Sequence, residues 1–175
     1  MKRPPLICGS NTYDLSHLHP IMVDYEQPAK DGKPSKSYQV EVQFSSHCFT
    51  RGQKVGEITS PDVCYREEGE TRIFDTARYE LSFGLPGIIR GLILKKCYHT
   101  GRSNFVTVEM LDRNGALVVY EVFFALYSLG KALKLKVQSA YVRDQDHKNR
   151  PQAKSIRFSV ILYNTLNGKA IKVQQ

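Results

Sequence analysis

The stretch FVTVEMLDRNGALVVYEVFFALY, residues 105–127, decides the fold. Two runs rich in β-branched and aromatic residues, 105–111 and 117–127, flank the turn sequence Asp112-Arg113-Asn114-Gly115. Asn-Gly between two such runs indicates a tight β-hairpin, because both turn positions accept positive φ angles. In the second run the residues of one face are all apolar: Val118, Tyr120, Val122, Phe124 and Leu126. The stretch therefore predicts a hairpin whose second strand buries that face.

Alternating segments continue on both sides of this hairpin. Apolar and polar residues alternate through 38–44 and through 133–137, which predicts two half-buried strands. Past the second of these segments the apolar positions change phase, so we expect a β-bulge near Ser139. Residues 156–162 alternate as well and predict another strand, and a short final strand is expected at 170–173.

The helical part of the chain is expected in two pieces, residues 75–83 and 85–96. Apolar residues spaced three and four apart form one stripe, made of Leu85, Ile88, Ile89, Leu92 and Ile93. Pro86 lacks the amide hydrogen that a helix interior uses, so it belongs in the first turn of the second piece. Asp75 is placed to cap the first piece.

Together these segments predict an α+β fold, in which a helical segment packs on one face of a mostly antiparallel β-sheet. The length of 175 residues fits a single domain spanning residues 1–175. Residues 1–36 hold five of the eight prolines, so we expect them to be irregular.

The positive charge is confined to the second half of the chain. Residues 1–89 carry ten Lys and Arg against twelve Asp and Glu, whereas residues 90–175 carry fifteen against five. The net charge of +8 and the isoelectric point near 9.3 therefore come from this basic, strand-rich half. Two interpretations stay open: a solvated surface that keeps the protein dispersed, or a surface for a polyanion such as nucleic acid.

Several classes of protein are excluded by what the sequence lacks. No apolar run approaches the roughly 18 residues that span a bilayer, so we expect no membrane partner. The basic N-terminus leads into no apolar stretch of the signal-peptide kind, and the four cysteines form no C-x-x-C pair. We therefore expect a cytoplasmic protein with reduced thiols. The motifs G-x-G-x-x-G, G-x-x-x-x-G-K-[ST], G-x-S-x-G and H-E-x-x-H are absent, and no cofactor is expected.

Five residues raise the question of a metal site: His47, Cys48, Cys64, Cys97 and His99. Their spacing is poor for structural zinc, whose ligands usually pair two to four residues apart. Free cysteines are often buried and need no ligand. We favour packed thiols and no metal, and the sequence alone leaves open whether these side chains ever bind one.

Candidate chemistry gathers in three segments at strand ends, residues 45–51, 97–104 and 141–144. Their histidines, hydroxyls, tyrosines and arginines are the groups that metal-free RNA cleavage needs: a base, an acid and cations for the phosphate. In this hypothesis His99 is the general base or acid, His47 is its partner, and Tyr141 stacks on a base or assists proton transfer. The residues assigned to nucleic-acid binding are Arg102, Arg143, Lys134 and Lys136.

The residues leave other functions open. Each histidine alone is more often an ordinary surface or hydrogen-bonded residue than a catalyst. The same basic sheet and the ten tyrosines and eight phenylalanines also suit a non-catalytic RNA- or DNA-binding module. A third function is stress adaptation through an acidic protein partner. The leading hypothesis is a nucleic-acid-acting protein, in its most concrete form a metal-independent, toxin-like ribonuclease.

Residues 72–102 and 137–144 resemble a group of small bacterial proteins labelled stationary-phase growth adaptation proteins. The resemblance covers most of the chain from Tyr38 onward, and it implies a physiological context but no chemistry and no site residue. In layout alone, a helix followed by a basic antiparallel sheet, the chain is similar to the RNase toxins that include barnase, EndoU, colicins and RelE-like domains. That likeness implies metal-free RNA cleavage, but no motif matches position by position.

Overall fold

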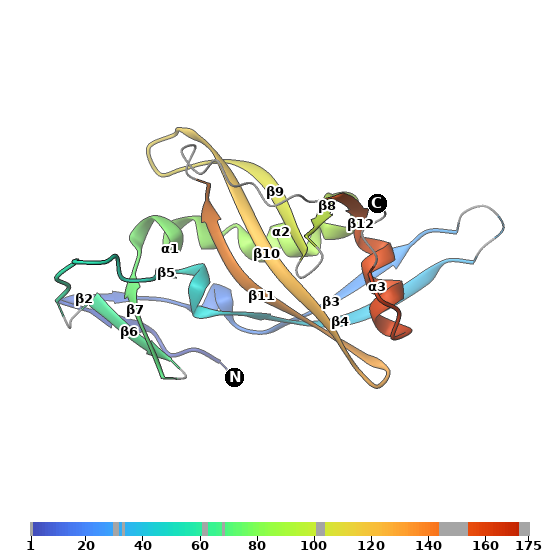
Figure 1. The fold of residues 1–175 in the computed structure, drawn as a ribbon, viewed down its shortest axis with the longest axis horizontal. Helices are drawn as coiled ribbons and strands as arrows, with labels where there is room; N and C mark the ends of the chain where they lie inside the picture. Colours follow the sequence, from blue (N-terminus) through green and yellow to red (C-terminus); the bar gives the residue numbers. More distant parts are fainter. Residues whose placement is uncertain are drawn as a thin grey trace.

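Within the described part of the chain, seven strands form the main β-sheet, which curls across the molecule (Figure 1). The computed structural model describes residues 2–29, 32, 34–60, 63–67, 69–100, 104–143 and 154–171. In spatial order the strands are β12 (Lys154–Arg157), β8 (Lys96–His99), β9 (Asn104–Leu111), β10 (Leu117–Leu129), β11 (Ala132–Val142), β4 (Lys36–Phe44) and β3 (Ile21–Gln27). Neighbouring strands are antiparallel except β11 and β4, which are parallel.

Two smaller sheets lie at one end of the molecule, at the left of Figure 1. One pairs β7 (Glu70–Phe74) with β5 (Thr50–Arg51) on one side and with β6 (Cys64–Glu67) on the other. The other joins β1 (Leu6–Cys8) to β2 (Asn11–Tyr13).

The helices are few and short. They are α1 (Thr76–Ser82), α2 (Leu85–Arg90) and α3 (Phe158–Leu166), with the 3-10 turns η1 (Ser16–Leu18), η2 (Ser46–Cys48) and η4 (Leu92–Leu94). As predicted, the Asp75 carboxylate caps α1 by accepting from the Arg78 amide at 3.0 Å, and Pro86 lies in the first turn of α2. The fold class is confirmed as α+β with a mostly antiparallel sheet.

The hairpin and the bulge are confirmed. Strands β9 and β10 pair in antiparallel register around a turn in which Gly115 has φ of 76°, a left-handed value that favours glycine. Between β10 and β11 the register shifts by one residue, because Phe124 pairs with Val137 while Phe123 pairs with Ser139. Gln138 is therefore the extra residue of the bulge.

The core is a cluster of buried apolar side chains from the main sheet, the helices and the 3-10 turns. Its fully buried members include these residues of β4, β10, β11, α2 and α3: Val40, Val42, Val122, Phe124, Leu135, Val137, Leu85, Ile89, Ile161 and Leu162. Burying a side chain of this size contributes about 1.5–3 kcal/mol, so these residues are the main source of stability.

The segment 156–162 is not the strand that its alternation predicts. Only residues 154–157 are extended, as β12, and α3 begins at Phe158. Phe158, Ile161 and Leu162 are buried, whereas Val160 is 41% exposed. The buried residues of this segment are three and four positions apart, as on one face of a helix. The alternation of apolar residues, which would suit a strand, does not decide the structure here. The expected final strand is absent at residues 170–171, and residues 172–173 lie outside the described part of the chain.

The first 36 residues are more regular than their prolines suggest. They contain β1, β2, η1 and β3, and β3 forms one edge of the main sheet by pairing with β4. Val23 and Tyr25 of β3 are buried. The five prolines of this segment are compatible with the arrangement because none of them lies within a strand, so no hydrogen bond between strands is lost.

Tyr25 and Tyr38 provide a matched test of this packing, because they face each other in the β3–β4 pair and both are buried. The Tyr25 hydroxyl donates to the Ile89 carbonyl at 2.7 Å, whereas the Tyr38 hydroxyl is buried with no hydrogen-bond partner among the described residues. We expect Tyr25→Phe to lower the free energy of unfolding by about 1 kcal/mol, and Tyr38→Phe to leave it unchanged or raise it. Urea unfolding of the two variants measures this difference, and equal losses would contradict it.

Candidate functional site

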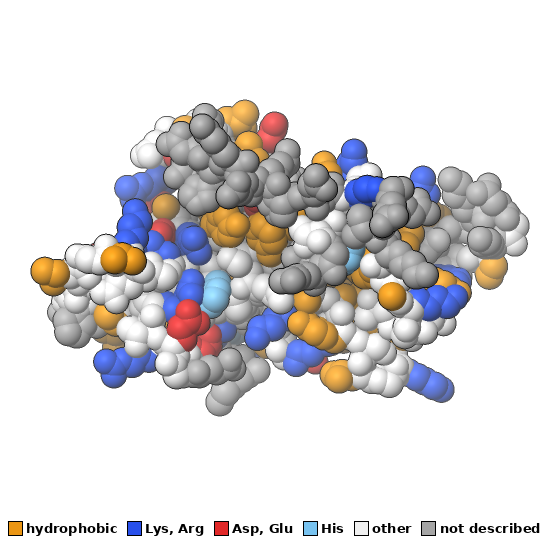
Figure 2. Space-filling model, in the orientation of Figure 1, with side chains coloured by type: hydrophobic (Ala, Val, Ile, Leu, Met, Phe, Trp, Pro, Cys, Tyr) orange, Lys and Arg blue, Asp and Glu red, His pale blue; other side chains and the backbone are white. Residues whose placement is uncertain are grey.

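A cavity of about 440 Å³ opens between the N-terminal segment, the end of β4, η2, the small sheet and β11. Its lining includes Lys2 and Arg3, then His47, then Glu67 and Glu70, and finally Lys136. Figure 2 shows a histidine on the molecular surface with acidic side chains directly beside it and basic side chains nearby. The cavity therefore combines a titratable imidazole with charges of both signs.

The turn η2 is fixed to β11 at the bulge. The Ser45 amide donates to the Val137 carbonyl at 3.0 Å, and the Ser45 hydroxyl donates to the Gln138 carbonyl at 2.6 Å. The Ser45 hydroxyl also accepts from the His47 amide at 3.3 Å, which caps the turn. Ser45 therefore donates to the two backbone carbonyls at the bulge and also begins the turn that carries His47.

His47 points outward because its neighbours are drawn into the core. Cys48 and Phe49 are fully buried, whereas the His47 side chain is 37% exposed. Its Nε2 lies 3.2 Å from a carboxylate oxygen of Glu70, and the other oxygen of Glu70 accepts from the Arg72 guanidinium at 2.7 Å. The hydrogen bond from Arg72, followed by that from His47, lowers the pKa of Glu70. The imidazole is thus oriented by an ionised carboxylate that is itself held in place.

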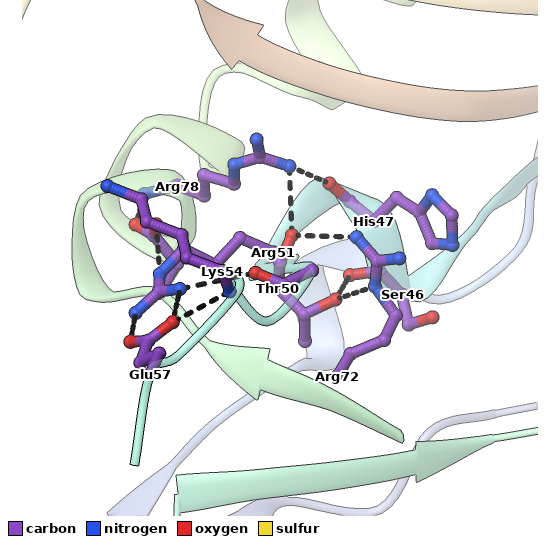
Figure 3. Close-up of polar contacts among 10 residues, drawn as sticks. Ser46, His47, Thr50, Arg51, Lys54, Glu57, Arg72 and Arg78 are labelled. Carbon is purple, nitrogen blue, oxygen red and sulfur yellow. Dashed lines mark hydrogen bonds and ion pairs between the residues drawn. The ribbon is translucent and has the colours of Figure 1, made fainter. Parts of the chain in front are cut away.

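Two arginines hold the loop behind His47 (Figure 3). Arg72 donates to the Thr50 hydroxyl at 2.7 Å and to the Thr50 carbonyl at 3.4 Å. Arg78 approaches from α1 and donates to the carbonyls of Thr50 and His47 at 2.9 and 3.3 Å. Burial lowers the pKa of Arg78, and the Asp75 carboxylate opposes this. Both guanidinium groups therefore hold Thr50 at the start of β5, and Arg78 also holds the backbone of η2 through the His47 carbonyl.

The opposite wall of the cavity is built around Arg3. Its guanidinium donates to the Tyr65 hydroxyl at 2.8 Å, to Glu67 at 2.5 Å and to the Phe44 carbonyl at 2.9 Å. Burial alone would raise the pKa of Glu67, but hydrogen bonds from Ser46 and Arg3 lower it overall. Both carboxylates of the cavity are therefore ionised and paired with an arginine inside the protein.

Of the residues predicted from the sequence, the structure places His47 and Lys136 together at the cavity. Lys134 lies two residues earlier on the same strand and is absent from the described lining. Tyr141 lies behind the cavity, with the Arg78 guanidinium 5.3 Å from its ring centre. Burial raises the pKa of Tyr141, so the phenol stays protonated at neutral pH.

Tyr141 belongs to a row of aromatic rings that crosses four strands of the sheet. The row is Tyr98 on β8, Phe105 on β9, Phe123 on β10 and Tyr141 on β11. Successive ring centres are 5.1, 5.2 and 5.5 Å apart, with planes within 29° of parallel. Because each inner ring packs against rings on both sides, the row acts as cross-strand packing more than as a platform for bases.

Arg143 is engaged within the protein. Its guanidinium forms two hydrogen bonds, of 2.8 and 2.7 Å, with the fully buried carboxylate of Glu121. A bidentate pair of this kind satisfies the arginine's fork geometry and leaves little of it for a ligand. The pairing explains how a carboxylate is tolerated in the middle of β10.

His99 lies away from His47. It is 7% exposed on β8, and its Nδ1 is 2.8 Å from the amide oxygen of Asn104. Three strand-to-strand steps, each about 4.8 Å, separate β8 from β11, where η2 is attached. His99 also lies on the face opposite Tyr98, and so opposite the aromatic row that contains Tyr141. The structure therefore does not bring the two predicted histidines together.

Arg102 and residues 144–150 lie outside the described residues. Cys48 and Cys97 are fully buried, and burial raises the pKa of each thiol to about 12. Within the described ranges, no three or more His, Cys, Asp and Glu side chains gather in a way that holds a metal ion. The two buried cysteines are packed thiols.

The sequence did not reveal Arg3, Glu70 or Arg72 as members of the site. Glu70 and Arg72 are two residues apart, and in a strand that spacing places both side chains on one face. A firmer prediction of β7 would have found that pair. No local signal points to Arg3, because its partners Tyr65 and Glu67 are more than sixty residues away.

Fold and site together define an α+β protein with a mixed-charge cavity at the junction of its sheets. Among the described residues, no helix is long and apolar enough to cross a membrane. The chain matches the model of the YjaZ family over residues 5–166. Protein YjaZ of Escherichia coli strain K12 is 30% identical over 160 residues, which cover 90% of this chain and 87% of that protein. No solved structure matches the chain.

The chain therefore belongs to the YjaZ family. The name of the relative states no activity. The likeness of layout to RNase toxins has no counterpart in these comparisons, and nothing in them carries a nuclease, toxin or stationary-phase role.

Arg143→Ala tests whether this arginine serves the fold. Truncation leaves the buried Glu121 carboxylate without its partner, so we expect a loss of about 3–5 kcal/mol in the free energy of unfolding. Arg113→Ala is the matched control, because Arg113 is 63% exposed and its contact with Glu80 is 3.5 Å long; we expect it to cost less than about 1 kcal/mol. Chemical denaturation measures both. Similar small losses would show that the Glu121 pair is not a structural requirement.

Proposed function

We propose that this protein binds nucleic acid, with RNA favoured, and that one nucleotide of the strand enters the His47 cavity. The observation that carries the proposal is the convergence of basic groups from three distant parts of the chain. Lys2 and Arg3 come from the N-terminal segment, His47 from η2 and Lys136 from β11. The volume of about 440 Å³ falls within the range of roughly 300–1,000 Å³ that small-molecule sites occupy.

The charge distribution in the cavity favours a phosphate. Glu67 is paired with Arg3 and Glu70 with Arg72, so neither carboxylate presents an uncompensated negative charge. Lys2 and Lys136 are then the cations that face a ligand. A lysine ammonium suits a phosphate that approaches from varied directions, because it acts as a point charge on a flexible stem.

Tyr65 supplies an aromatic wall for the base. It lines the cavity, and its hydroxyl is held by Arg3 at 2.8 Å. Tyr65 also packs edge-on against Phe49, which limits its motion. A positioned aromatic ring beside basic groups is the usual arrangement for single-stranded nucleic acid, and it tolerates different bases.

Lys136→Gln tests the position of the nucleic-acid site, and Lys134→Gln is its matched control. Both lysines are on β11 and both changes remove one charge, but only Lys136 lines the cavity. We expect Lys136→Gln to weaken binding of a labelled single-stranded RNA and to reduce the slope of log K against log salt by about 0.7. Lys134→Gln should leave the slope close to that of the wild type.

Fluorescence anisotropy across a salt series gives these slopes. Equal effects of the two substitutions would move the site away from the cavity. If the wild type shows no salt-dependent binding of RNA or DNA, the proposal fails, and an acidic protein partner takes its place.

RNA cleavage is a second candidate function, favoured by the chain of contacts from His47 through Glu70 to Arg72. A carboxylate-oriented imidazole at a cavity wall is suited to remove a proton from a ribose 2′-hydroxyl. The 2′-oxygen would then attack phosphorus, and the 5′-oxygen would leave with a proton supplied by the solvent or a cavity ammonium. Lys136 is placed to stabilise the developing charge on phosphate.

Cleavage is tested by incubating RNA with the wild type, His47→Asn and His99→Asn in the presence of EDTA. If His47 is the acid–base group, His47→Asn should slow cleavage by roughly 10²–10⁴-fold, whereas His99→Asn should cleave at the wild-type rate. Denaturing gels read the products, and circular dichroism verifies that both variants are folded. Intact RNA with the wild type would reject the catalytic function and leave the binding function standing.

A further inference from the structure

A second cavity, of about 530 Å³, lies at the other edge of the main sheet. It is enclosed by η4, β8, β12 and the first turn of α3. Its described lining comprises Ile93, Leu94, Lys95, Lys96, Ser155, Ile156, Arg157 and Ser159. Three of these side chains are basic, and no Asp or Glu is among the described residues that line it. The cavity near His47 differs in this respect, because Glu67 and Glu70 are among its lining residues.

The basic side chains of the second cavity repel one another. Lys96 on β8 and Arg157 on β12 are directly opposite in the antiparallel register, and Lys95 is adjacent in sequence. Like charges in directly opposed positions of a β-ladder destabilise the pair. The β8–β12 pairing would therefore be stabilised by an anion placed between them.

The start of α3 adds to the positive potential in the same place. Arg157 is the residue that precedes the helix, it makes no capping hydrogen bond, and the first turn contains no acidic residue. A cation at this end is unfavourable for the helix dipole. The opposed cations and the uncapped helix end therefore both call for negative charge in one cavity.

The rest of the lining consists of three apolar residues and two serines. Ile93 and Ile156 are partly buried against the core, and Leu94 is 90% exposed. Ser155 and Ser159 add hydroxyl groups that donate readily to phosphate oxygens. A ligand that fits all of these features has a phosphate at one end and an apolar or aromatic group at the other.

We propose that this second cavity binds a small phosphate monoester that carries an apolar or aromatic group. Lys96 and Arg157 contact the phosphate, and Ile93 and Leu94 contact the apolar group. The site is separate from the His47 cavity, because β8 and β12 lie at the edge of the sheet, beyond β9 and β10 from β11. It therefore stands whether or not the protein binds RNA.

Titration with phenyl phosphate, followed by isothermal calorimetry at low ionic strength, tests the site. We expect Lys96→Gln and Arg157→Gln each to raise Kd about tenfold, the amount that corresponds to one charge-assisted hydrogen bond. Lys131→Gln, an exposed change in the β10–β11 turn, should keep the wild-type Kd. Inorganic phosphate should bind more weakly than phenyl phosphate. No binding by the wild type, or equal weakening by Lys131→Gln, would overturn the proposal, and equal affinity for inorganic phosphate would overturn its apolar part.

Thermal unfolding, measured with and without phenyl phosphate, gives an independent test. Removing one of two opposed charges should relieve their repulsion, so Lys96→Gln should raise Tm at low salt and should lose most of the Tm increase that phenyl phosphate gives the wild type. Lys131→Gln should show neither effect. A lower Tm for Lys96→Gln, together with an unchanged response to phenyl phosphate, would show that Lys96 is not part of an anion site.

Discussion

The attachment of Ser45 to the bulge in β11 is the constraint on which the rest of the structure depends. Before the bulge, β11 pairs with β4 in parallel and closes the core. At the bulge the hydrogen-bond ladder between β11 and β4 ends. The Ser45 amide donates to the Val137 carbonyl there, and the Ser45 hydroxyl donates to the Gln138 carbonyl. The chain turns there into η2, which buries Cys48 and Phe49 and directs His47 outward. A bulge re-aims the chain at a sheet edge, and here it converts the end of a core strand into the wall of a cavity.

The arginines of this protein act mainly inside the structure. Four of them donate to backbone carbonyls, to a hydroxyl or to carboxylates of the same chain: Arg3, Arg72, Arg78 and Arg143. A planar guanidinium suits this work because its donors fit two fixed acceptors at once. Net charge alone is thus a poor guide to where a ligand binds. In the His47 cavity the basic groups without an internal carboxylate partner assigned above are Lys2 and Lys136, and the imidazole of His47 lies beside them. The composition of the sequence does not distinguish such groups from the arginines that stabilise the fold.

Local signals predicted the elements whose cause is local. The Asn114-Gly115 turn, the phase change near Ser139, the capping by Asp75 and the break at Pro86 were all readable because each depends on a few adjacent residues. The prediction for segment 156–162 was wrong because its apolar residues fit both the spacing of a strand and the spacing of a helix, and only packing against the core decides between them.

The functional site was harder to predict than the fold. His47 and Lys136 were identified as residue types, but their meeting depends on the parallel pairing of β11 with β4, which brings together residues that are far apart in sequence. The same sheet order keeps His99 away.

The two cavities differ in how their charge is compensated, and this sets what each can recognise. In the His47 cavity the pKa of Glu67 and of Glu70 is lowered, so both carboxylates stay ionised as the pH falls toward their ordinary values. Glu67 is paired with Arg3 and Glu70 with Arg72, so the charges on this side of the cavity are compensated within the protein. Glu70 stabilises the folded state above its unfolded pKa, and that contribution is lost only as the pH falls through its lower folded pKa. Among the described residues that line the second cavity, no Asp or Glu accompanies Lys95, Lys96 and Arg157. In the functions proposed for the two cavities, the first would select a ligand by the arrangement of paired charges, whereas the second would select it by the excess of basic side chains in its lining.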